Sequence, residues 1–320
     1  MSNYNFRKGI TYGLLGTFLI GLQPVISNAR PSVIDPFIFA AVTAQIQALI
    51  FLPIYLFTRK SLITNKSDEI IPQIRDSLLN GWRKKKNFYL LIIIGISFSI
   101  VPVLLYIGFE LAGAINSSLT LKSEIIFALL FGMIILKEKK ISITQVIFCI
   151  VLYFGLILAI TKGSFNLLEF NVGVIILTIS VGLFTFMHAL TKSGFDRNEI
   201  FPSQVIFVRN LISGVILILI YLIFFPIAKL QLLLDFKNFI FFILMSLDYG
   251  IGLFLWYKTL TYIEIGKASI INSLSPIVSA FFSWLILGEI FTIYHLFGTL
   301  IIVFSIYMIV REKKVNSDKI

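Results

Sequence analysis

Ten long apolar segments determine what this 320-residue chain can fold into. Each is about 20 residues long, the length at which a helix crosses a bilayer core of roughly 30 Å. The chain is 58% hydrophobic and 13% charged, whereas about 25% of the residues of a soluble domain are charged. The composition therefore predicts an all-α integral membrane protein with ten transmembrane helices, at residues 9–26, 37–57, 88–109, 114–136, 142–161, 172–191, 203–225, 238–260, 267–288 and 291–310.

The first apolar segment has two possible interpretations. Arg7 and Lys8 precede it, as basic residues precede the apolar part of a secretory signal. A comparable segment opens the second half of the chain, where Gly173 corresponds to Gly9. We therefore expect residues 9–26 to be a retained helix.

Residues 105–138 resemble residues 255–289, so the chain contains an internal repeat. A single shift aligns Tyr106 with Tyr257, Ala128 with Ser279, Leu136 with Leu287 and Glu138 with Glu289. Two apolar helices can also look alike through composition alone. The shared loop and the shared terminal Leu-x-Glu favour duplication, and a membrane chain built from two similar halves is typical of a secondary transporter.

The distribution of Lys and Arg predicts the orientation of the chain. With ten helices and a cytoplasmic N-terminus, most of the 27 basic residues fall in the N-terminus, 58–87, 137–141, 192–202, 258–267 and the tail from Arg311. The outside loops hold only Arg30, Lys162, Lys229 and Lys237. The positive-inside rule then places both termini in the cytoplasm, and the cell (plasma) membrane is the expected location. The net charge of +11 does not indicate a nucleic acid partner, because the excess of basic residues on the cytoplasmic side and their attraction to anionic lipids explain it.

Five helices in each half make the two halves cross the membrane in opposite directions. The basic loop around Glu138 is then inside, and its equivalent around Glu289 is outside and has lost its lysines. The fold class is therefore two inverted five-helix repeats. The cytoplasmic loop 58–87 has no counterpart in the second half, and we expect a short surface helix near residues 70–82.

No pattern in the chain indicates catalysis or a cofactor. Cys149 is the single cysteine, and His188 and His295 have no acidic or Cys neighbours at metal-ligand spacing. Glycine-rich phosphate loops and nucleophile elbows are missing from the sequence. We therefore expect no cofactor and no metal, and we expect that the protein is not an enzyme.

The fourth helix of each half ends in the same short motif. It reads Leu-Lys-Glu at residues 136–138 and Leu-Gly-Glu at residues 287–289. Together with the five-plus-five helix pattern, this motif resembles the drug/metabolite transporter superfamily, EamA type. The resemblance covers residues 9–310, with a first EamA-like repeat over 1–161, a second over 172–311 and a cytoplasmic tail over 312–320.

Two proline motifs of that family are matched in the second half alone. The family tends to carry Pro within the fourth helix of a half, matched by Pro276, where the first half has Ile125. It also tends to carry Pro followed seven residues later by Arg in the second helix. Pro202 and Arg209 match this motif, whereas the first half has Thr43 at the second position. These motifs imply transport and say little about the substrate.

Four ionisable residues lie inside the predicted helices: Lys122, Glu124, Arg209 and Asp248. Such residues cost roughly 2.5–3.5 kcal/mol each on insertion scales, so they are usually paired or line a water-filled path. Arg209 is close enough to the cytoplasmic end to extend its side chain to the interface instead. Lys122 and Glu124 are about 200° apart on an ideal helix, so we expect one of them to find a partner on another helix or in water.

Polar and aromatic residues surround these charges and suit a cavity wall. Asn116 and Asn272 lie in the fourth helices, and Tyr106, Trp256 and Tyr257 lie in the third helices. We predict that they bind substrate or couple transport together with the four ionisable residues. The alternatives are that the polar residues join helices by hydrogen bonds and that the aromatic residues form an interfacial belt.

Three residues are expected to be structural: Glu138, Pro276 and Glu289. Each Glu follows an apolar helix, where its carboxylate can cap the N–H groups of the following helix.

The predicted function is secondary transport of small organic metabolites by alternating access, with possible proton or ion coupling through Glu124 or Asp248. The expected partners are a small-molecule substrate and membrane lipids, and the sequence leaves the oligomeric state open. A lipid or lipid-intermediate flippase of the same architecture is an alternative. An integral-membrane enzyme is an alternative of a different class, and it would need clustered catalytic residues.

Overall fold

The computed structural model describes residues 3–64, 72–137, 141–165, 172–263 and 265–315. Every secondary-structure element in these ranges is helical. The α-helices are α1 (Asn3–Ala29), α2 (Pro36–Ile63), α3 (Pro72–Asn80), α4 (Lys85–Ser97), α5 (Val101–Ala112), α6 (Ala114–Thr120), α7 (Glu124–Ile134), α8 (Ile143–Ile160), α9 (Val172–Asp196), α10 (Pro202–Phe224), α11 (Phe236–Tyr262), α12 (Ile265–Asn272), α13 (Ser275–Leu287) and α14 (Ile293–Val315). Short 3₁₀ helices are η1 (Gly81–Arg83), η2 (Leu121–Ser123) and η4 (Ile227–Leu234).

Eight helical stretches are long and apolar enough to cross a membrane. They are Arg7–Ala29, Pro36–Ile63, Lys85–Ala112, Ala114–Ile134, Ile143–Ile160, Val172–Asp196, Pro202–Phe224 and Phe236–Tyr262. Two shorter apolar helices follow, Ser275–Leu287 and Ile293–Ile309. The multi-helix membrane fold is therefore present, and the number of ten crossings stays a prediction.

Helices α2 and α10 begin in the same way, at equivalent places in the two halves. Each has Pro in its first turn, where the missing N–H costs no hydrogen bond. At α2, the Asp35 side chain also accepts hydrogen bonds from the N–H groups of Phe37 and Ile38, both at 3.0 Å. This N-cap fixes where the helix starts.

The internal repeat reappears as a repeat of helix breaks. The shift that aligns Tyr106 with Tyr257 also aligns the first residue of α6 with that of α12, and the first residue of α7 with that of α13. The segments 88–109, 114–136 and 267–288, which were expected to be single helices, are each interrupted. In the first half, the interruption near the centre is the 3₁₀ turn η2, which rotates the side chains that follow it.

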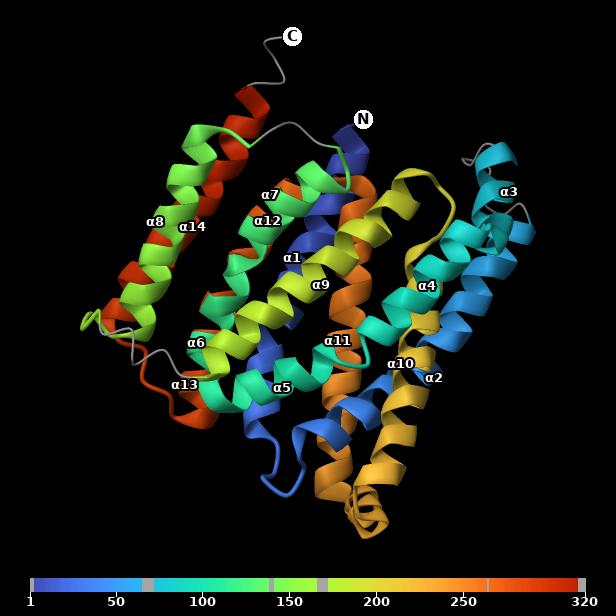
Figure 1. Ribbon diagram of the computed structural model, residues 1–320, viewed down its shortest axis with the longest axis horizontal. Helices are drawn as coiled ribbons and strands as arrows, with labels where there is room; N and C mark the ends of the chain where they lie inside the picture. The colour runs from blue at the N-terminus through green and yellow to red at the C-terminus, as the bar shows by residue number, and fades with distance from the viewer. Residues whose placement is uncertain (1–2, 65–71, 138–140, 166–171, 264, 316–320) are drawn as a thin grey trace.

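Figure 1 shows the arrangement of the bundle. Helices α8 and α14 lie side by side at one edge, and α2 and α10 lie together at the other. Between them, α1 packs along α11, and α5 packs along α9. The described ends of α1 and α14, the helix α3 and the loop between α9 and α10 all lie at one end of the bundle (Figure 1). The expected short helix in loop 58–87 is confirmed as α3.

Candidate functional site

A buried cavity lies between the two halves of the chain. Its walls come from α1, α5, η2, α7, α9, α11 and α12, through Ile20, Gln23, Leu105, Phe109, Leu121, Lys122, Glu124, Phe184, His188, Tyr249, Leu253, Trp256 and Asn272. Water-sized molecules can occupy about 60 Å³ of it, several times the ~10–15 Å³ that one water needs. The cavity is therefore large enough for a small solute, and both halves form its walls.

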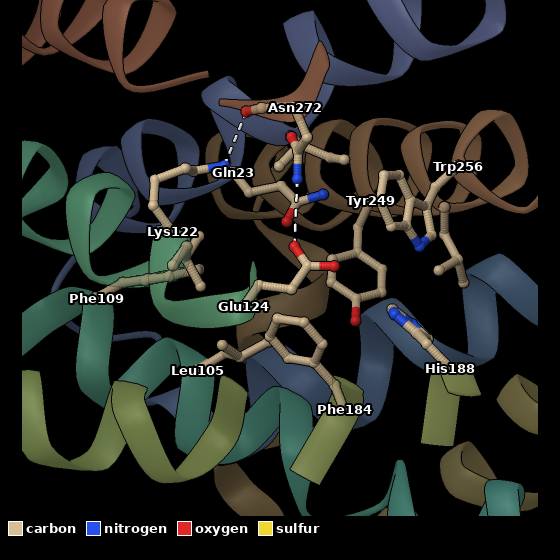
Figure 2. Close-up of a pocket in the computed structure, with 13 residues that line it drawn as sticks. Gln23, Leu105, Phe109, Lys122, Glu124, Phe184, His188, Tyr249, Trp256 and Asn272 are labelled. Atoms are coloured by element: carbon tan, nitrogen blue, oxygen red, sulfur yellow. Dashed lines mark hydrogen bonds between the residues drawn. The ribbon is translucent and has the colours of Figure 1, made fainter. Parts of the chain in front are cut away.

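Lys122 and Glu124 meet at one residue of the other half. Lys122 Nζ donates to the backbone carbonyl of Asn272 at 2.8 Å, and Asn272 Nδ2 donates to Glu124 Oε2 at 3.3 Å (Figure 2). The side chains are buried, with exposed fractions of 3% for Lys122 and 7% for Glu124. This chain of hydrogen bonds joins η2 and α7 to α12.

The helix breaks explain this convergence. Asn272 is the last residue of α12, so its carbonyl has no partner within the helix and accepts from Lys122 instead. Lys122 lies in the 3₁₀ turn η2, and Glu124 begins α7. The angle of about 200° expected for an ideal helix therefore does not describe this segment. One of the two was predicted to find a partner on another helix. In the structure both do, and the partner of both is Asn272.

Arg209 is held inside the bundle, with 1% of its surface exposed. Its Nε and Nη2 donate to Asn210 Oδ1 at 3.2 and 3.1 Å, and Asn210 Nδ2 donates to Gln47 Oε1 at 2.9 Å. The guanidinium carbon lies 4.0 Å from the centre of the Phe98 ring. The alternative in which Arg209 extends to the interface is therefore wrong.

Asp248 is 6% exposed, and neither of its carboxylate oxygens has a hydrogen-bond partner in the described part of the chain. It precedes Tyr249, which lines the cavity, but it does not line the cavity itself. A buried carboxylate without a partner is costly inside a membrane, which marks Asp248 as a candidate functional residue.

Of the remaining predicted site residues, some line the cavity and others pack outside it. Trp256 lines the cavity, whereas the Tyr257 ring packs at 5.4 Å against both His188 and Phe195. Tyr106 is buried against Phe39, with ring centroids 4.8 Å apart. Tyr106 and Asn116, on α5 and α6, are not among the lining residues. Their proposed contact with substrate stays a prediction.

Comparison with known proteins supplies the family. The EamA-like transporter family matches residues 7–161 and 171–311, nearly the whole chain in two blocks. This chain belongs to the EamA-like transporter family. It is a multi-pass membrane transporter, and its family points away from an enzyme.

This EamA transporter is also similar to one curated relative and to one solved structure. It is 26% identical over 296 residues to an uncharacterized transporter of Methanothermobacter thermautotrophicus (strain Delta H), covering 88% of this chain and 79% of that protein. A crystal structure superposes with a TM-score of 0.63 over 96% of both chains. Its sequence identity of 12% means that this likeness shows the fold alone.

Sequence reasoning missed three polar side chains of the cavity. Gln23 on α1, His188 on α9 and Tyr249 on α11 all line it. His188 was considered only as a metal ligand, although an uncharged polar residue within a membrane helix is itself a signal of a cavity. Gln23 carried the same signal within the first apolar segment of this EamA transporter.

Glu289 caps a helix, although not the helix that was expected. Its carboxylate accepts from the backbone N–H groups of Ala114 at 2.8 Å and Ile115 at 3.0 Å. These residues begin α6 in the other half, so the prediction that Glu289 caps the following helix is wrong. Pro276 lies in the first turn of α13, a position that suits Pro. Glu138 lies outside the described residues.

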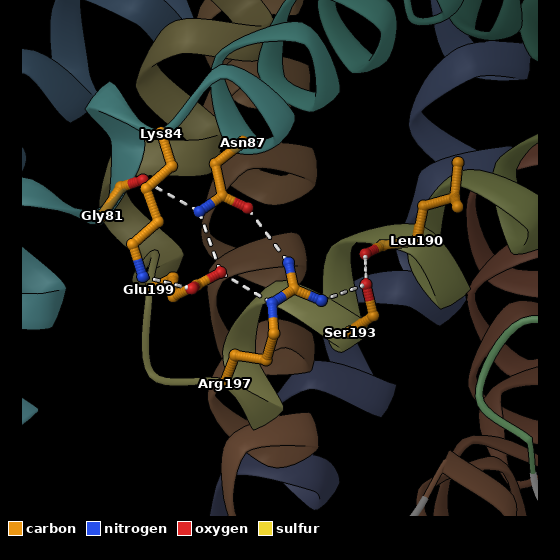
Figure 3. Close-up of polar contacts among 7 residues, drawn as sticks. All are labelled: Gly81, Lys84, Asn87, Leu190, Ser193, Arg197 and Glu199. Carbon is orange, nitrogen blue, oxygen red and sulfur yellow. Dashed lines mark hydrogen bonds and ion pairs between the residues drawn. The ribbon is translucent and has the colours of Figure 1, made fainter.

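A second inter-half contact of this EamA transporter lies at the end of the bundle that carries α3. Glu199, in the loop between α9 and α10, bonds Lys84 at 2.6 Å, Arg197 at 2.6 Å and Asn87 at 3.0 Å (Figure 3). Partial burial raises the pKa of Glu199, but these three hydrogen bonds outweigh it and lower the pKa to about 2. We call Lys84, Asn87, Arg197 and Glu199 the clasp.

Proposed function

We propose that this EamA protein is a secondary transporter that moves small organic metabolites by alternating access. The observation that carries this proposal is the cavity whose lining comes from both halves, with Lys122 and Glu124 of the first half bonded to Asn272 of the second. A solute held there touches both halves, so a rocking motion of one half against the other changes its access.

Contacts between the halves lie at both ends of the bundle and support this cycle. Glu289 bonds the start of α6 at one end, and the clasp joins α4 to the loop after α9 at the other. In alternating access, one set of contacts opens while the other closes. Under the charge distribution above, the clasp is the cytoplasmic set, with both termini in the cytoplasm of a cell membrane.

Proton coupling is assigned to Glu124 and Asp248. Both carboxylates are buried, Glu124 faces the cavity, and Asp248 has no hydrogen-bond partner in the described chain. Burial makes ionisation costly, so each can take up a proton when its surroundings close. A proton bound with substrate and released with it links the two fluxes.

Transport in proteoliposomes tests the proposed function. Purified protein is reconstituted, and a mixture of radiolabelled small organic acids, amines and neutral metabolites is offered with and without an imposed pH gradient. We expect at least one solute to accumulate in proteoliposomes and not in protein-free liposomes. If the protein scrambles fluorescent lipids between the two leaflets and no solute accumulates, the result would support the flippase alternative instead.

A further inference from the structure

Arg209 carries a buried charge that no acidic side chain of the described residues neutralises. Among the described residues, none of the ion pairs includes Arg209. Asn210 occupies its Nε and Nη2, and Phe98 packs against the guanidinium. Its Nη1 is buried and has no hydrogen-bond partner in the part of the chain that the structure describes. The site therefore orients a guanidinium and leaves the N–H groups of Nη1 free, which is costly inside a membrane unless an anion accepts from them.

Arg209 does not line the cavity itself, but its guanidinium carbon lies 5.6 Å from the centre of the Tyr249 ring, and Tyr249 does line it. Two more nitrogen donors lie on the cavity side of Arg209. The ring nitrogens of His188 and the indole Nε1 of Trp256 are buried and have no hydrogen-bond partner among the described residues, and both side chains line the cavity. The His188 ring stacks on the Phe98 ring that holds Arg209, with centroids 6.1 Å apart. Figure 2 shows the indole nitrogen of Trp256 directed toward the imidazole of His188. A neutral imidazole and an indole each offer one N–H to a ligand.

The charges of the cavity leave Arg209 uncompensated. Lys122 and Glu124 meet at Asn272 on another wall, and their charges offset each other. Asp248 forms no ion pair with Arg209 in the described structure, and in the coupled cycle it carries a proton when substrate binds. With Glu124 ionised beside Lys122, Arg209 is then the one uncompensated positive charge among the described residues of this site, which matches a ligand with a single negative charge.

We propose that Arg209, together with His188 and Trp256, binds the carboxylate of a small organic acid, so that the transported substrate class is monocarboxylates. A carboxylate accepts hydrogen bonds only, and it fits the planar edge of a guanidinium. The apolar part of the acid rests on Leu253 and Phe184, which line the cavity. A phosphate dianion brings a second negative charge, and the described residues of the site offer no second free cation to match it. This assignment rests on the transport function proposed above.

Binding is tested without transport by titrating the full chain in nanodiscs with benzoate, benzamide and phenylphosphonate. Benzamide keeps the shape of benzoate and removes the charge, and phenylphosphonate offers the phosphate-like alternative. We expect benzoate to bind on the order of tenfold more tightly than benzamide, because charge-assisted hydrogen bonds are the stronger kind. Equal affinities, no binding of benzoate, or tighter binding of phenylphosphonate would overturn the monocarboxylate assignment.

Variants locate the site. Arg209→Gln should reduce the benzoate affinity to that of benzamide, and Arg209→Lys should keep part of the preference. Lys237→Gln removes the same charge from an exposed position on α11 and should keep the full preference. If Arg209→Gln does not fold, Trp256→Phe removes one N–H, keeps an aromatic ring and should weaken benzoate several-fold. A folded Arg209→Gln or Trp256→Phe variant with the wild-type ratio of affinities would overturn the proposal.

Uptake measurements separate this inference from the proposed function. Benzoate that binds through Arg209 but never accumulates in proteoliposomes would contradict transport and leave the carboxylate site standing. Accumulation of an amine or a neutral solute that is unaffected by Arg209→Gln would support transport and contradict the carboxylate site.

Discussion

The carboxylate of Glu289 caps the backbone N–H of Ala114, across the boundary between the two halves, at 2.8 Å. Ala114 is the first residue of α6, where N–H groups have no partner within the helix. Gly113 precedes it with φ +78°, a conformation that favours glycine. A side chain at the end of one repeat therefore completes a helix in the other, and the repeats depend on each other for stability.

Removing this cap should destabilise the protein rather than change its substrate. Glu289→Ala is expected to cost about 0.5–2 kcal/mol, the usual cost of losing an N-cap side chain. Glu289→Gln keeps one acceptor and should cost less. Thermal unfolding in detergent and the yield of monodisperse protein measure both. Normal yield with selectively abolished transport would contradict the structural role.

The clasp predicts a dependence of stability on pH. The folded-state pKa of Glu199, about 2, lies below the value of about 4.3 for an unperturbed Glu. Its stabilising contribution is therefore complete above about pH 4.3 and is lost as the pH falls toward 2. Glu199→Gln should lower the free energy of unfolding by about 1–3 kcal/mol at pH 7.

The pH dependence of unfolding separates the clasp from other carboxylates. The wild-type melting temperature should fall more steeply between pH 5 and pH 3 than that of Glu199→Gln. Asp76→Asn, an exposed change on α3, serves as the matched control. Parallel melting curves for wild type and Glu199→Gln over this range would show that the ion pairs of Glu199 contribute nothing.

Coupling through Glu124 and Asp248 predicts a specific transport defect. Wild-type accumulation should respond to an imposed pH gradient. Glu124→Gln or Asp248→Asn should keep substrate exchange and lose gradient-driven accumulation, because an amide cannot carry the proton. Purely structural carboxylates predict lost folding or an unchanged pH response. Gradient-driven accumulation that survives in the double variant would exclude both residues from coupling.

The predicted orientation can be tested by labelling single cysteines. In a Cys149→Ser background, Gln73→Cys places a thiol on α3, and Ser164→Cys places one in the loop after α8; both positions are exposed. An impermeant thiol reagent applied to intact cells should label position 164 and spare position 73. Labelling at position 73 alone would reverse the orientation.

The sequence predicted the helices because a bilayer leaves few alternatives for a long apolar segment. It also predicted, from burial cost and helix geometry, that one of Lys122 and Glu124 needs a partner on another helix or in water. It did not predict the partner, because ideal helical geometry was assumed through η2. The sequence did contain a sign of this break, because Pro276 lies at the equivalent position of the second half, where α13 begins.

Other features depend on tertiary contacts that one sequence does not contain. Nothing local distinguishes a Glu that caps the next helix from one that caps a helix about 175 residues away, as Glu289 does with Ala114. Likewise, Arg209 looked able to reach the interface until the position of Phe98 was known. These contacts arise when two repeats pack, and neither repeat specifies them alone.

The matching breaks at α6–α7 and α12–α13 also mean that the two repeats have diverged into unlike roles. Lys122 and Glu124 align with Ser273 and Ser275, and Asn272 aligns with Leu121. A chain made of two copies of the first repeat would bury two lysines and two glutamates with leucine where their shared asparagine stands. Ancestral symmetry survives here in the backbone, while the side chains make the two halves no longer interchangeable.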